Sequence, residues 1–107
     1  MRFGVSTHLY HDARLDRDHL VEIAAHGFET VEIFATRTHV DYHDAAVLAQ
    51  LREHLRDAEL AAHSVHGPIT DGLNGSTWGA SYSLAMAEES ARVLAVEETL
   101  SAMRAAA

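Results

Sequence analysis

Apolar residues recur along this chain at two spacings, and the two spacings alternate. Every-second-residue alternation and short β-branched runs predict strands over residues 2–9, 30–35 and 61–66. Apolar residues three or four positions apart predict a helix after each strand. The helices are expected from an N-cap at Asp16 to about His26, along the stripe of Leu48, Leu51, Leu55 and Ala58, and from about Ser81 to the last residue.

Turn signals separate these predicted elements. Gly27 suits the left-handed position that follows a helix, and either Asp41 or Asp44 can cap the second helix. Glycines and small polar residues over residues 67–79 predict a loop, which contains Asn74.

The order β-α-β-α-β-α predicts an α/β fold with a parallel sheet and right-handed connections. Two architectures remain open: a small open α/β sheet, and the N-terminal part of a (β/α)8 TIM barrel. A complete barrel typically needs about 250 residues, whereas this chain has 107. The final helix also lacks a glycine or proline stop signal. We therefore expect a single partial domain over residues 1–107, made of three βα units and truncated at its C-terminal end.

Composition narrows the function classes. The chain has 16 acidic and 8 basic residues and a formal net charge of −8, which argues against nucleic acid and anionic membranes as partners. It has no cysteine, so disulfides, thiolate zinc sites and a cysteine nucleophile are excluded. Neither a signal peptide nor an apolar run of about 18 residues is present, and we expect a cytoplasmic protein. Nine histidines predict sensitivity to pH near about 6.5.

Three residues are the strongest candidates for a functional site. Parallel βα folds bind ligands at the carboxyl ends of their strands, where His8 and His66 are predicted to lie. Strand alternation puts Glu32 on the face opposite Val31 and Ile33. If these faces point into a barrel, His8, Glu32 and His66 line one mouth, and can serve as metal ligands or acid–base groups.

Other polar segments suggest weaker hypotheses. Residues 39–44 (HVDYHD) contain metal-ligating residue types, but they span a loop and a helix start, and we interpret them as a pocket rim. The loop with Asn74 offers amides that can cradle a polyol or a phosphate, and Trp78 and Tyr82 can wall a sugar ring. The acidic pairs at 88–89 and 97–98 are expected on solvated helix faces.

Three segments carry a family resemblance. Residues 3–7 (FGVST), 27–34 (GFETVEIF) and 64–68 (SVHGP) resemble the first three strands of the xylose-isomerase-like TIM barrels. That superfamily contains sugar-phosphate isomerases and epimerases and the related apurinic endonucleases. The resemblance covers nearly the whole chain, but only the first three βα units of such a barrel.

The resemblance implies an isomerase or epimerase of a sugar or sugar phosphate that uses a divalent metal (Mn, Zn or Mg). In the epimerase branch, glutamates move a proton next to a carbonyl while the metal polarises substrate oxygens. His66 matches a third-strand histidine that binds zinc in the endonuclease branch, and Glu32 matches a second-strand carboxylate. His8, Glu32, His66 and Asn74 are accordingly expected to contact substrate, and His66 to contact metal.

Most of the family's ligands lie on later strands of the barrel. The isolated chain is therefore expected to be inactive, with no catalytic residue assigned. The divalent metal is expected in the complete barrel, and metal binding by this chain alone is left open. The chain is also expected to self-associate through exposed sheet edges. Two alternatives stay open: a metal-dependent phosphodiester hydrolase of the endonuclease branch, and a non-catalytic α/β domain for oligomerisation or ligand binding.

Overall fold

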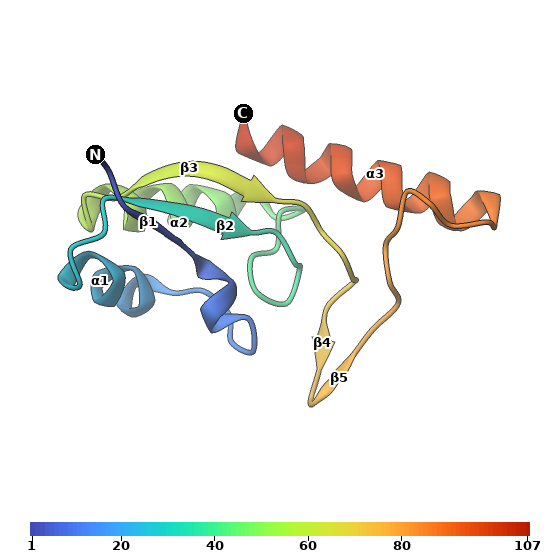
Figure 1. Cartoon of the computed structure of the whole chain (residues 1–107), viewed down its shortest axis with the longest axis horizontal. Coiled ribbons are helices and arrows are strands. Elements are labelled where there is room, and N and C mark those ends of the chain that lie inside the picture. Colours follow the sequence, from blue (N-terminus) through green and yellow to red (C-terminus); the bar gives the residue numbers. More distant parts are fainter.

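A computed structural model describes residues 1–107, and it is an α/β fold built on a parallel three-stranded sheet in the order β1-β2-β3 (Figure 1). The predicted α/β class and parallel sheet are confirmed. The sheet strands are β1 (Gly4–Ser6), β2 (Thr30–Phe34) and β3 (Ala61–His66), and the other elements are a 3-10 helix η1 (Thr7–Tyr10), α1 (Arg17–Ala25), α2 (Ala45–Asp57), β4 (Leu73–Asn74), β5 (Thr77–Trp78) and α3 (Glu89–Ala106).

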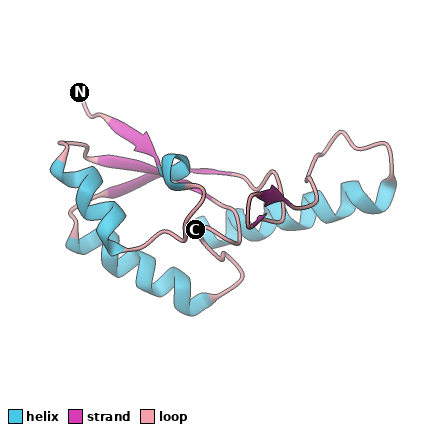
Figure 2. Ribbon diagram, turned by 90° about the horizontal axis from the view of Figure 1, so that it is seen from below, coloured by secondary structure: helices cyan, strands magenta, loops and turns pink.

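One face of the sheet carries the main hydrophobic core. Val31 and Ile33 of β2 are buried against Leu20 of α1 and Leu55 of α2, so both helices cover the same face (Figure 2). Burying such side chains stabilises the fold by about 1.5–3 kcal/mol each. The alternate residue Glu32 lies on the opposite face, which no helix of this pair covers.

The helix-end signals act as predicted. Asp16 is the N-cap of α1: its carboxylate accepts from the His19 backbone N–H at 3.2 Å. Gly27 follows α1 with φ at 89°, the left-handed region that glycine adopts most easily. Of the two candidate caps for α2, Asp44 is the one used, because its carboxylate accepts from the Ala46 N–H at 2.9 Å.

The first predicted strand is wrong beyond Ser6. The chain leaves β1 there and turns into η1, because the Ser6 side chain accepts from the His8 backbone N–H at 3.2 Å. Thr7 is then fully buried, and its hydroxyl accepts from the Phe34 N–H at 3.0 Å. His8 therefore lies on a 3-10 helix above the end of β2 and not on a strand.

The segment between β3 and α3 also differs from the prediction. The expected loop contains a short antiparallel hairpin, in which Asn74 of β4 pairs with Thr77 of β5. The expected helix start at Ser81 is wrong, because Ser81 bridges to Thr70 and extends the hairpin. α3 begins only at Glu89, where the Glu88 carboxylate supplies the cap.

α3 extends away from the sheet, and its C-terminal turns lie beside β3 (Figure 1). There Ala102 packs in a small second cluster with Ala35 and Tyr42. No helix combines the length and apolar character needed to cross a membrane.

Candidate functional site

Phe34 organises the carboxyl end of the sheet. Its ring is fully buried, and the imidazoles of His8 and His66 meet it edge-on, with ring centroids at 4.6 and 5.5 Å. The two imidazoles lie 6.5 Å apart, centroid to centroid. The structure thus brings His8 and His66 together as the sequence predicted, although η1 and not a strand positions His8.

Glu32 lies on β2 two residues before Phe34, and so further from the carboxyl end of the sheet. It is level with Ser64 in the sheet register, and the Ser64 hydroxyl donates to the Glu32 carboxylate at 3.2 Å. A hollow of about 540 Å³ covers this open face of the sheet, lined in part by Ser6, Thr30, Glu32, His63 and Ser64. Since neither His8 nor His66 lines that hollow, the three predicted residues form two neighbouring groups instead of one ring.

The β4–β5 hairpin brings an aromatic side chain to the histidines. Trp78 stacks on His11 with ring centroids at 5.7 Å, and His11 stacks on His8 at 5.0 Å. Asn74, on the same hairpin, is exposed and forms no side-chain hydrogen bond with His8, Glu32 or His66. A role for Asn74 in binding substrate stays a prediction.

His39 holds η1 on the end of β2. Its imidazole is fully buried: Nδ1 donates to the Ala13 carbonyl at 2.7 Å, and Nε2 accepts from the Thr7 hydroxyl at 3.1 Å. These partners select the neutral tautomer with the proton on Nδ1. Burial lowers the pKa of His39 below its usual 6.5. The expected pocket rim is therefore wrong for His39, which supports the position of His8 from inside the fold.

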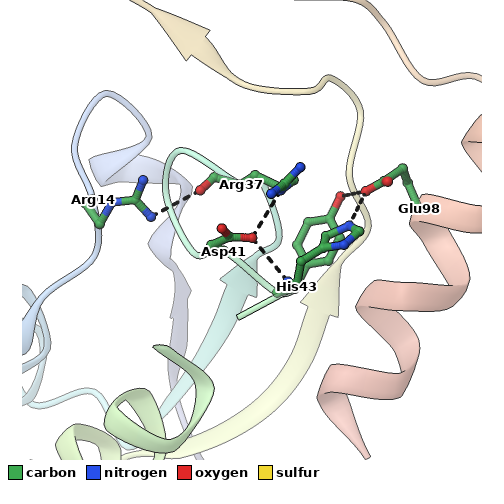
Figure 3. Close-up of polar contacts among 6 residues, drawn as sticks. Arg14, Arg37, Asp41, His43 and Glu98 are labelled. Atoms are coloured by element: carbon green, nitrogen blue, oxygen red, sulfur yellow. Dashed lines mark hydrogen bonds and ion pairs between the residues drawn. The ribbon is translucent and has the colours of Figure 1, made fainter. Parts of the chain in front are cut away.

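Glu98 belongs to a second polar cluster, which the sequence did not predict. Glu98 as a residue is only 8% exposed, and its carboxylate accepts from the Tyr42 hydroxyl and from His43 Nε2, the latter at 2.9 Å (Figure 3). Burial raises the pKa of Glu98, but the hydrogen bonds from Tyr42 and His43 outweigh it and the pKa falls below its usual range. Burial and the bond to Glu98 raise the pKa of Tyr42.

The expectation that Glu98 is solvated is wrong, and one signal pointed to its burial. Glu98 falls in helical register with Ala95 and Ala102, which form the face of α3 that packs on the rest of the protein. The loop between β2 and α2, which carries Tyr42 and His43, has further polar contacts. In it Arg37 pairs with Asp41 at 3.1 Å, and Arg14 donates to the Arg37 carbonyl (Figure 3).

Comparison with known proteins adds no family assignment. No protein-family model, curated protein or solved structure matches this chain.

The residues at this end do not form a complete metal site by themselves. No group of three His, Asp or Glu side chains converges with the geometry of metal ligands, whereas catalytic zinc sites use three protein ligands. His8 and His66 supply two imidazoles, and Glu32 is engaged with Ser64. The divalent metal implied by the resemblance requires further ligands from outside these residues.

Proposed function

We propose that this chain forms three βα units of a xylose-isomerase-like (β/α)8 barrel, and that the carboxyl end of its sheet binds a sugar or sugar phosphate for isomerisation or epimerisation. The main support is the sequential order β1-β2-β3 with α1 and α2 on one face of the sheet. Barrel walls have this arrangement, whereas open doubly wound sheets carry helices on both faces. In the proposed barrel, the face with Glu32 is the inner one.

The side chains available at this end suit a polyol. Sugar hydroxyls both donate and accept hydrogen bonds, and Glu32 offers a carboxylate acceptor while each imidazole offers a donor and an acceptor. Trp78, which ends the stacked row with His11 and His8 and is 41% exposed, offers aromatic surface on which the apolar face of a sugar ring can pack.

The proposed roles of these residues are binding and orientation. Glu32, steadied by the Ser64 hydroxyl, accepts from a substrate hydroxyl, and His8 and His66 donate to hydroxyl or phosphate oxygens. A divalent metal, when bound in the complete barrel, polarises substrate oxygens and so acidifies the carbon next to the carbonyl. The group that removes that proton is not assigned to this chain.

The endonuclease-type alternative has weaker support. Phosphodiester substrates require clustered lysine and arginine, and Arg2 is the only such residue lining the hollow over the open face. The net charge of −8 opposes a polyanionic substrate further.

Titration with sugars tests the proposal directly. Histidine-labelled protein is titrated with a pentose phosphate, a hexose phosphate and the corresponding free sugars, with inorganic phosphate as a separate probe. We expect saturable shifts of the His8 and His66 imidazole resonances in NMR spectra. Glu32→Gln and His66→Ala should each weaken binding about tenfold, the loss of about 1.4 kcal/mol.

His26→Gln is the matched control, because His26 is an exposed histidine at the end of α1, where the chain enters the amino end of β2. It should leave the affinity unchanged. Absence of saturable shifts with every sugar, or equal losses in the His26 and His66 variants, would contradict the proposal. Shifts with inorganic phosphate alone would identify an anion site without sugar recognition.

A further inference from the structure

α3 carries a regular apolar stripe on the side that faces away from the sheet. The stripe consists of Val93, Val96 and Leu100, which are spaced by three and four residues and are between 43% and 49% exposed. This spacing matches consecutive a, d and a positions of a heptad pattern, by which helices pair side by side. We call these three residues the α3 seam.

The contacts of α3 with the rest of the protein fix the direction of the seam. Glu98, bonded to Tyr42 and His43, faces inward together with buried Ala95 and Ala102. Successive helix residues are rotated by about 100°, so this inward set and the seam lie on opposite sides of α3. The seam is therefore held facing solvent and does not need to reorganise before it binds a partner.

The chain exposes more area than a compact monomer of its mass. It exposes 6651 Å², whereas a compact monomer of its 11.7 kDa mass exposes about 5,900 Å². The excess of about 750 Å² belongs to the whole chain, including the open face of the sheet, and is of the order of the roughly 800 Å² that each partner buries in a standard interface. The radius of gyration is likewise 14.3 Å, against about 13 Å for a compact chain of this length.

The charges beside the seam favour a second copy of the same chain. Arg92 and Glu97 flank the seam five residues apart, so two α3 helices running in the same direction place Arg92 of each copy opposite Glu97 of the other. Arg92 uses Nη1 for the carbonyls of Met86 and Ala87, and its Nη2 remains for this pair. The seam itself contains no charged residue, so no charge has to be buried in the contact.

We propose that α3 is a dimerisation helix, through which two copies of this chain pair seam to seam in a symmetric, parallel arrangement. This contact differs from the pairing of sheet edges, because it leaves the open edges of β1 and β3 outside the interface. It also leaves the carboxyl end of the sheet uncovered, so the proposal stands independently of the sugar site.

Sedimentation of the wild-type chain and two matched variants tests the proposal. At tens of micromolar the wild-type chain should sediment at twice its 11.7 kDa mass. Leu100→Asp places a charge in the seam and should raise the dimer dissociation constant at least tenfold. Leu94→Asp makes the same change on the same helix at nearly equal exposure, 45% against 43%, but outside the seam. It should remain a dimer.

A second measurement covers the case in which Leu100→Asp fails to fold. The urea midpoint of the wild-type chain should rise with protein concentration, because dimerisation stabilises only the folded state. A wild-type monomer at 200 μM would overturn the proposal, as would equal dissociation by both variants. A dimer that survives Leu100→Asp would overturn it too, in favour of the sheet edges. Sugar binding by the Leu100 variant should be unchanged, which separates this test from the previous one.

Discussion

Thr7 links η1 to the end of β2, and replacing it measures how strongly that link holds His8 in place. The Thr7 side chain is fully buried, and its hydroxyl accepts from the Phe34 N–H and donates to His39 Nε2. Thr7→Val keeps the shape of the side chain but leaves both partners buried and unpaired. Each such group costs about 1–3 kcal/mol. We expect the free energy of unfolding to fall by about 2–6 kcal/mol for the two groups together, a large part of the about 5–15 kcal/mol typical of a domain.

Thr36 provides the matched control for this substitution. It too is fully buried, but its hydroxyl has no hydrogen-bond partner. Thr36→Val exchanges the same atoms and removes a polar group that burial already penalises. The free energy of unfolding should stay unchanged or rise by up to about 1 kcal/mol. The two valine variants should therefore differ by at least about 2 kcal/mol.

Urea unfolding followed by circular dichroism at pH 7.5 gives these free energies, provided that the m values agree. Thr7→Ser keeps the hydroxyl and loses one methyl group, so it should cost only about 1 kcal/mol. The reasoning is refuted if Thr7→Val lies within about 0.5 kcal/mol of wild type. It is refuted equally if Thr36→Val is as destabilised as Thr7→Val.

Four further predictions concern the same framework. Burial lowers the folded-state pKa of His39, so the unfolded chain takes up the proton first as the pH falls. The free energy of unfolding should therefore fall as the pH drops below about 6.5. An NMR titration should show a His39 midpoint below that of an unfolded histidine. The pKa of Glu98 is lowered, so its contribution to the stability of the fold should persist above pH 4.5 and disappear as the pH falls through the folded pKa below that value. Faster amide exchange in α3 would report the loss. Tyr42→Phe should speed that exchange already at pH 7. Asp16→Ala should cost about 1 kcal/mol in urea unfolding through loss of the α1 cap, and no change would argue against it. Gly27→Ala should cost a similar amount, about 1 kcal/mol, because φ is 89° there, and an alanine variant as stable as wild type would contradict that reason.

Local signals were sufficient where neighbouring residues decide the conformation. The β-branched run of β2, the cap at Asp16 and the left-handed turn at Gly27 all depend on residues within a few positions. The end of β1 does not, because Thr7 leaves the strand direction to bond Phe34, 27 residues away. The hairpin was missed for a different reason: its paired residues are close in sequence, but β4 and β5 contain only two residues each, too few to show an alternating pattern.

In the candidate site, too, general sequence rules predicted some features, whereas contacts between residues distant in the sequence set the others. The pairing of His8 with His66 followed from the general rule about strand ends, even though the predicted strand was too long. The helical register of Glu98 with Ala95 and Ala102 indicates its burial, but no local pattern identifies its partner Tyr42, which lies 56 residues away. Long-range hydrogen bonds of this kind set the positions of η1 and α3, and periodicity carries no information about them.

The two opposite faces of α3 restrict which changes in chain length this protein can accept. An extra residue between Ala95 and Glu98 would rotate the first half of the helix by about 100° relative to the second. Val93 would then turn away from Leu100 while Glu98 kept its contact with Tyr42. A substitution within α3 changes one contact, whereas an insertion there changes the direction of the seam relative to the face that carries Glu98. Between the hairpin and α3, variation in length should therefore be tolerated best over residues 83–87, which lie between the bridge at Ser81 and the cap at Glu88.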